Sequence, residues 1–190
     1  SGRWQTAAAG AGTQTAAIIF GGFEPGSTGK TEEYNGTSWT EVNDLNTARH
    51  NAQGTGSQTA GILAGGENPS PTRFTNTEEY NGTSWTEVND LSTARASGST
   101  IGSDASNYLV AIGNAPPGVV ATTEQYDGTN WSTGATATTA RTLAAGSSFA
   151  SPSAGIIASG NAPPYSNATE EYNFTANTIT AGAWASANAI

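Results

Sequence analysis

The sequence predicts an all-β protein built from four copies of a unit of 46 residues. Four tyrosines recur at this interval, and the fifteen residues from Thr31 to Leu45 return unchanged from Thr77 to Leu91. Short apolar runs alternate with turn residues, and no apolar spacing of 3.6 persists over a helical length. The repeated tyrosines are Tyr34, Tyr80, Tyr126 and Tyr172. A fixed period of this kind indicates a repeat architecture.

Glutamates, arginines and tryptophans share the period. They are Glu32, Glu78, Glu124 and Glu170; Arg3, Arg49, Arg95 and Arg141; and Trp39, Trp85 and Trp131. The position in phase with a fourth tryptophan is Asn177, so the last unit lacks its tryptophan in phase. We expect one domain over residues 1–190, with units at about 1–46, 47–92, 93–138 and 139–190. The arginines and glutamates could form a ring of ligands around a central channel. We expect them to be structural, since a guanidinium can hold carboxylates or backbone carbonyls and so lock one unit to the next.

Each unit is expected to supply four antiparallel strands. In the second unit they cover RHNAQGTGSQT, AGILAGG, TEEYNG and SWTEVND. The second run is almost continuously apolar, which predicts burial on both faces. The Asn-Gly or Asp-Gly pair before the fourth strand predicts a tight two-residue hairpin turn with positive φ.

Such a unit cannot cover its own apolar strand, so it must stack on copies of itself. Radial closure of the array leaves only short, protected strand edges. The sequence therefore predicts a β-propeller of four 46-residue, four-stranded antiparallel blades, with the repeated aromatic side chains packed between blades. Four blades could close alone, pair with a second copy to make eight, or belong to a longer array.

The units share an order of motifs. It consists of an apolar strand that ends in two glycines, then a tyrosine, then a tryptophan, and then Thr-Ala-Arg. The glycine pairs are Gly21 with Gly22 and Gly65 with Gly66, and asparagine replaces the second glycine at Asn114 and Asn161. This pattern resembles the kelch repeat over nearly the whole chain. The resemblance implies a propeller that binds partners through loops on one face. The near-identity of the first two units also resembles propeller segments of phage and environmental viral genomes.

Composition excludes several classes of partner and site. The formal net charge of −9 would repel a phosphate backbone, so we expect no nucleic-acid binding. No apolar run approaches the length that spans a bilayer, so we expect a soluble chain without membrane insertion. Cysteine is absent, which excludes disulfides and thiolate metal sites.

The residues for catalysis or metal binding are also missing from the pattern. His50 is the one histidine, and no Gly-x-Ser-x-Gly elbow presents a nucleophile. We therefore expect no catalytic residue, no metal site and no cofactor. The pairs Asn43–Asp44 and Asn89–Asp90 could ligate calcium, but they stand where turn residues belong. The N-x-S/T patterns, such as that at Asn35, could be sites of glycosylation, but they too stand where turn residues belong.

The loops after the second strand differ most between units. They read FEPGSTGK, ENPSPTRFTN, APPGVVAT and APPYSNA. Loops on a rigid scaffold often carry binding residues, and proline lowers the entropy lost on binding. The alternative is that these are variable solvated loops. The candidate binding residues are Phe23, Glu24, Arg73, Phe74, Pro116, Pro117 and Tyr165.

The leading hypothesis is a non-enzymatic recognition or display module that binds a protein or a surface glycan, in an extracellular or virion-associated location. The alternative is a purely structural repeat that assembles or decorates a larger particle, with self-association to complete a larger ring. A third hypothesis, a carbohydrate-active enzyme, conflicts with the missing catalytic residues.

Overall fold

The computed structural model describes residues 2–8, 12–147, 154–162, 165–173 and 183–187. Within these residues every regular element is a β-strand, and the strands form four sheets of four strands each. Neighbouring strands are antiparallel and follow one another in chain order within each sheet. The prediction of an all-β chain with four antiparallel strands per unit is confirmed. No helix in the described part of the chain is long and apolar enough to cross a membrane.

Each sheet falls within one of the predicted units. The first contains β1 (Ala7–Ala8), β2 (Ala17–Phe20), β3 (Thr31–Tyr34) and β4 (Trp39–Val42). The second contains β5 (Gln53–Ser57), β6 (Ala60–Ala64), β7 (Thr77–Tyr80) and β8 (Trp85–Val88). The third contains β9 (Ser99–Asp104), β10 (Asn107–Ala115), β11 (Gly118–Tyr126) and β12 (Trp131–Thr133). The fourth contains β13 (Ala145–Gly146), β14 (Ala154–Ala158), β15 (Thr169–Asn173) and β16 (Ala183–Ala187).

Two local predictions were wrong in detail. The first strand of the second unit begins at Gln53 and not at Arg49, because Asn51 has a φ of 53° and interrupts the extended backbone. The turn between β3 and β4 leaves four residues between the strands. The Asn35 side chain closes it by accepting hydrogen bonds from the backbone N–H groups of Thr37 (2.9 Å) and Ser38 (3.0 Å), while Gly36 has a φ of 92°.

The last unit lacks a tryptophan in phase, but it has one out of phase at the equivalent place in the sheet. Trp184 in β16 pairs with Tyr172 in β15, as Trp39 pairs with Tyr34 and Trp85 with Tyr80. This tryptophan stands twelve positions after its tyrosine, whereas the others stand five positions after theirs. The intervening segment is longer, so a comparison at fixed phase points to Asn177, which lies outside the described residues.

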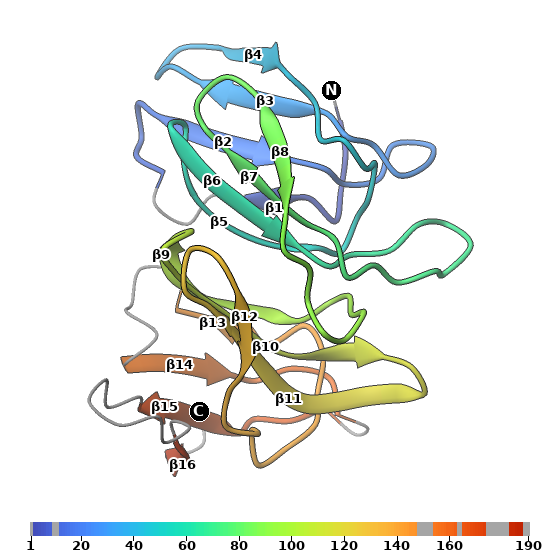
Figure 1. Cartoon of the computed structure of the whole chain (residues 1–190), viewed down its shortest axis with the longest axis vertical. Helices are drawn as coiled ribbons and strands as arrows, with labels where there is room; N and C mark the ends of the chain where they lie inside the picture. Colours follow the sequence, from blue (N-terminus) through green and yellow to red (C-terminus); the bar gives the residue numbers. More distant parts are fainter. Residues whose placement is uncertain (1, 9–11, 148–153, 163–164, 174–182, 188–190) are drawn as a thin grey trace.

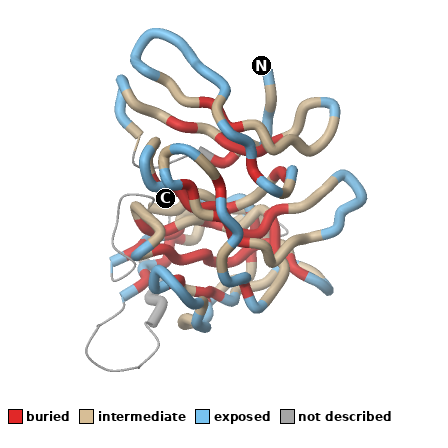
Figure 2. Tube along the Cα trace, turned by 45° about the horizontal axis from the view of Figure 1, so that its top comes forward, coloured by how far each residue is buried: buried red, intermediate tan, exposed pale blue. Residues whose placement is uncertain are grey.

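The four sheets form a row in chain order, with the first and fourth at its two ends (Figure 1). Strand β1 contacts β5, β5 contacts β9, and β9 contacts β13. Buried segments lie between neighbouring sheets, whereas the outer hairpins are exposed (Figure 2). One hydrophobic cluster fills each of the three junctions. The clusters include Ala7, Ile18, Phe20, Leu45, Leu63, Tyr80 and Trp85 at the first; Ile62, Ala64, Leu91, Tyr108, Val110 and Tyr126 at the second; and Ile101, Leu109, Ala111, Ile112, Ala137, Ile157 and Tyr172 at the third.

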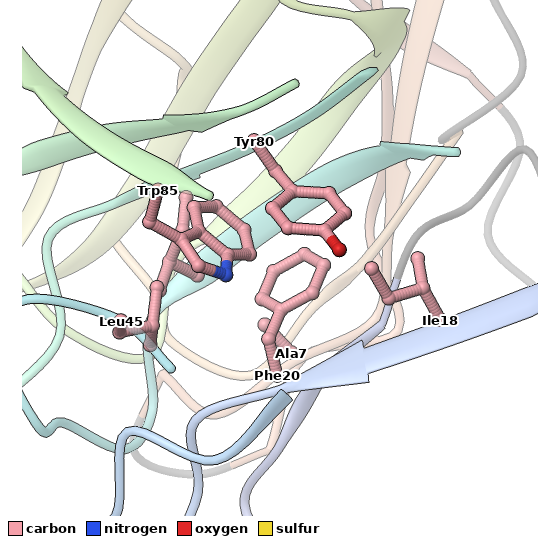
Figure 3. Packing of buried hydrophobic residues seen from close by; sticks show 7 residues of the cluster. Ala7, Ile18, Phe20, Leu45, Tyr80 and Trp85 are labelled. Atoms are coloured by element: carbon pink, nitrogen blue, oxygen red, sulfur yellow. The ribbon is translucent and has the colours of Figure 1, made fainter. Parts of the chain in front are cut away.

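The first junction shows why the fifteen-residue segment recurs. The rings of Tyr80 and Trp85 from the second sheet lie against Phe20 of the first (Figure 3), and the centroids of Phe20 and Trp85 are 4.9 Å apart. Trp85 Nε1 donates to Thr31 Oγ1 at 2.9 Å, so the indole N–H is satisfied inside the junction. Full burial of each such side chain contributes roughly 1.5–3 kcal/mol. The prediction that the repeated aromatics pack between units is confirmed here.

Candidate functional site

The loops after the second strand of each sheet project from the same edge of the molecule, on the right in Figure 1. The segments that join one unit to the next run along this edge too. Gly22 N donates to Arg49 O at 2.9 Å, and Leu45 N donates to Gly29 O at 2.8 Å. We call this side, formed by residues 21–30, 65–76, 113–119, 159–162 and 165–168 with the joining segments, the loop edge. The loop of the first unit is therefore held by backbone hydrogen bonds to the segment that joins it to the second unit.

The predicted binding residues all lie on the loop edge but do not form one group. Phe23 is half-buried, with its ring centroid 5.1 Å from that of Trp4. Glu24 pairs with Lys30 at 2.6 Å, and this contact raises the pKa of Lys30. Arg73 lies 4.0 Å from the Glu67 carboxylate.

The remaining candidates belong to three different units. Phe74 is half-buried in the loop of the second unit, where its backbone N–H donates to Gly66 O. Pro116 and Pro117 are exposed at the tip of the β10–β11 hairpin. Tyr165 in the fourth unit is 87% exposed. The most accessible aromatic surface among the predicted residues is therefore that of Tyr165.

Sequence reasoning missed a polar cluster at the junction of the first two units. Ser27 Oγ lies 2.8 Å from His50 Nδ1, and His50 Nε2 lies 3.9 Å from Glu67 Oε1. The second distance is too long for a hydrogen bond, and the imidazole is buried. The group therefore lacks the aligned contacts of a Ser-His-carboxylate relay. Its contacts instead hold the joining segment between the loops of the first two units. His50 contacts Ser27 of the first loop, and Asn51 Nδ2 donates to Glu67 Oε1 of the second at 2.9 Å.

A row of four residues with positive φ also crosses the loop edge, one from each unit. They are Gln5, Asn51, Ser97 and Leu143. Each backbone N–H after the first donates to the carbonyl of the preceding member, at 3.2, 2.8 and 2.9 Å. The residues that precede them are Trp4, His50, Ala96 and Thr142, so both positions differ in every unit.

Two large apolar side chains are exposed at this row. Trp4 is 60% exposed and Leu143 is 66% exposed. Neither belongs to a loop that follows a second strand, which is why they were not singled out. The signal was nevertheless present, because the two letters after each repeated arginine change from unit to unit. Comparison of those letters would have identified Trp4.

The repeated arginines and glutamates are buried ion pairs. The Arg–Glu distances are 3.0, 3.1, 2.8 and 2.7 Å in successive units. Burial lowers the pKa of Arg95, while the charge and hydrogen bond of Glu124 oppose that shift. Each Arg–Glu pair lies within one unit, but the backbone of Arg49 bonds to the preceding loop through Thr28 and Gly22. Arg49 thereby links the two units.

The glutamates hold the joining segments in place. Glu78 accepts hydrogen bonds from the backbone N–H groups of Asn46 (2.7 Å) and Thr47 (3.2 Å). Glu170 accepts one from Thr138 N at 2.6 Å. Burial acts to raise the pKa of Glu170, but the hydrogen bonds of Thr138 and the charge of Arg141 outweigh it, so the pKa lies below its usual value. These carboxylates are therefore fully occupied by structural contacts.

A cleft of about 270 Å³ lies away from the loop edge, between the outer strands of the second and third sheets. Its walls include Glu79, Val88, Asn89, Tyr126 and Thr129. Burial and a hydrogen bond to Glu79 raise the pKa of Tyr126. Asn89 Nδ2 donates to Thr129 O at 2.8 Å, so this asparagine serves to bridge two hairpins.

No protein-family model matches the sequence, and no curated protein matches it. The solved structure of YjhT is similar in fold, with a TM-score of 0.77 and 14% sequence identity. The match includes all of this chain and 66% of the YjhT chain. This chain thus spans just under two thirds of the length of that protein. At this level of identity the similarity concerns the fold alone.

Proposed function

We propose that the chain is a kelch-like β-propeller array that acts as a non-enzymatic recognition or display module and binds a glycan or a protein at its loop edge. The observation that carries the proposal is the contrast within each unit. The buried contacts repeat from unit to unit, whereas the exposed side chains of the loop edge change. Variable residues on loops held by a rigid scaffold are typical of a binding surface.

The chemistry of the loop edge suits an apolar or sugar-ring contact flanked by polar groups. Trp4 is 60% exposed, and its ring rests on Phe23, which fixes the indole without covering it. Aromatic side chains present large contact areas at low conformational cost. The paired charges of Glu24 and Lys30 lie on the same loop as Phe23 and supply hydrogen-bonding groups nearby.

The place of display and the competing functions are also part of the proposal. A module of this kind suits display on a virion or a cell surface. A purely structural role is the second candidate. It is favoured by the exposed Trp39 and Ile156 on the first and fourth sheets, where further copies could stack. Catalysis is disfavoured by the geometry of the single histidine, because its nearest carboxylate is 3.9 Å from Nε2.

The test is selective binding of the purified chain to a glycan array and to surface-protein extracts. The double variant Trp4→Ala/Tyr165→Ala removes the two most exposed aromatics of the loop edge. The control Thr37→Ala/Thr83→Ala changes exposed residues in the hairpin turns at the opposite edge. We expect the first variant to weaken binding about 30-fold or more, as removal of aromatic anchors does, and the control to bind normally. Equal affinities of all three proteins, or no selective binding by the native chain, would contradict the proposal.

A further inference from the structure

The outward face of the first sheet is an uncovered copy of a face that is buried elsewhere. Tyr80 and Trp85 of the second sheet are 3% and 6% exposed, because they lie against the first sheet. Their counterparts in the identical segment of the first sheet have no preceding sheet to cover them. There Tyr34 is half-buried and Trp39 is 46% exposed. We call the surface of Tyr34 and Trp39 the Trp39 face.

The outward face of the fourth sheet is uncovered in the complementary way. Ile156 pairs with Glu171 across β14 and β15, as Ile18 pairs with Glu33 in the first sheet. Ile18 is 1% exposed beneath the second sheet, whereas Ile156 is 40% exposed. Glu171 is exposed as well. We call the surface of Ile156, Thr169 and Glu171 the Thr169 face.

Thr169 carries a second, independent sign of a missing neighbour. In the first two sheets the equivalent threonines accept a hydrogen bond from the tryptophan of the next unit. Trp85 Nε1 donates to Thr31 at 2.9 Å, and Trp131 Nε1 donates to Thr77 at 3.1 Å. Thr169 Oγ1 is buried and has no hydrogen-bond partner among the described residues. A buried hydroxyl without a partner is costly, so this position favours a donor, which reaches the covered oxygen only if the atoms over it move.

Two further contacts of the interior junctions also have open counterparts at the ends. Tyr80 Oη donates to Glu33 Oε1 at 3.0 Å, and the matching groups at the ends are Tyr34 Oη and Glu171. The row of positive-φ residues ends with the N–H of Gln5 on one side and the carbonyl of Leu143 on the other. In the interior these same two backbone groups bond to each other. Each end of the array therefore presents one half of a junction whose backbone bond the chain makes three times and whose Trp–Thr bond it makes twice among the described residues.

We propose that the Trp39 face of one copy docks on the Thr169 face of a second copy, head to tail. The Thr169 face offers Trp39 the threonine that Trp85 meets at Thr31, whereas the position of Phe20, on which Trp85 packs, is taken by Ala158. Trp39 would donate to Thr169 Oγ1, and Tyr34 to Glu171. Such a contact joins two different surfaces, so two copies close into a ring if the rotation allows it, and otherwise form an open chain. The contact is independent of ligand binding at the loop edge.

The first test is the molar mass of the unsubstituted 190-residue chain by light scattering across a concentration series. We expect species heavier than the 19.1 kDa protomer, with a population that rises with concentration. Trp39→Ala and Ile156→Glu each alter one open face at a position that is exposed within the protomer. Each should weaken association about 30-fold or more, since truncating a central aromatic anchor has this effect. Val119→Ala is the control, because it removes exposed apolar surface from an interior unit, away from both open faces, and should associate normally.

Mixing the two variants tests the head-to-tail orientation. Trp39→Ala retains an intact Thr169 face, and Ile156→Glu retains an intact Trp39 face, so the mixture should form a heterodimer through one native contact. Thermal melting of each variant at low concentration checks that the protomer remains folded. A mass of 19.1 kDa at every concentration would overturn the proposal and assign the open faces to another partner. Association that survives both substitutions, or a mixture that forms no heterodimer, would overturn it too.

Discussion

Replacing Trp85 with alanine should destabilise the protomer far more than replacing Trp39, although the two tryptophans occupy the same place in identical fifteen-residue segments. Trp85 is 6% exposed, packs 4.9 Å from Phe20 and donates to Thr31, whereas Trp39 is 46% exposed. Loss of a buried tryptophan costs about 3–5 kcal/mol. The buried Thr31 hydroxyl would also lose its donor, which adds about 1–3 kcal/mol.

The cost at Trp39 should be about 1–2 kcal/mol, since roughly half of its surface has no packing to lose. The assay is urea unfolding at a concentration where the chain is monomeric, followed by circular dichroism. With a urea m-value of about 2 kcal/mol/M, the two midpoints should differ by at least about 1 M. Equal midpoints for the two variants would refute the reasoning, because identical local sequences would then have identical stability effects whatever their neighbours.

Three further outcomes can be measured. Glu124→Gln should lower the free energy of unfolding, measured by urea unfolding, by about 3–5 kcal/mol, because it leaves the buried Arg95 without its countercharge. A smaller loss in Arg95→Met/Glu124→Leu, which removes both charges, would confirm that the unpaired charge is the cause. The pKa of Glu170 is lowered in the folded state, so its contribution to folding stability is fully present above the unfolded-state pKa of about 4.3. That contribution is lost as the pH falls through the folded-state pKa. The difference in unfolding free energy between the native chain and Glu170→Gln should therefore shrink in acid and stay constant at neutral pH. Burial and the hydrogen bond to Glu33 raise the pKa of Tyr80 to about 12, so Glu33→Gln should lower the Tyr80 midpoint in an NMR titration, and an unchanged midpoint would contradict the role of that carboxylate.

The repeat could be predicted from the sequence because the buried contacts are made by the same residue types at a constant interval. Tyr80 contacts Glu33, and Trp85 contacts Thr31, of the preceding sheet. Both pairs join neighbouring copies of the same segment. Where the interval changes, the prediction fails. Trp184 was overlooked because the connection before β16 is longer than in the other units, although its backbone pairing with Tyr172 is the same.

The candidate site could be predicted only as a region. The contrast between constant and variable letters pointed to the loop edge, where Phe23, Arg73 and Tyr165 all lie. It did not show that Ser27, His50 and Glu67 meet across two units, because that depends on how the joining segment bends at Asn51. Nor could any single unit show that Ile156 and Trp39 are exposed. Both have the residue types of an interior position, and only their place at the ends of the row leaves them uncovered.

The hydrogen bonds from Asn46 and Thr47 to Glu78 have a consequence for the history of the chain. The second unit contributes both Glu78, the carboxylate that receives the incoming backbone, and Thr77, the threonine that receives the next indole. A duplicated stretch of one period would therefore arrive with both halves of its contacts already encoded. An in-frame duplication could lengthen the array without any compensating mutation, and the two identical fifteen-residue segments have the form that a recent event of this kind would leave.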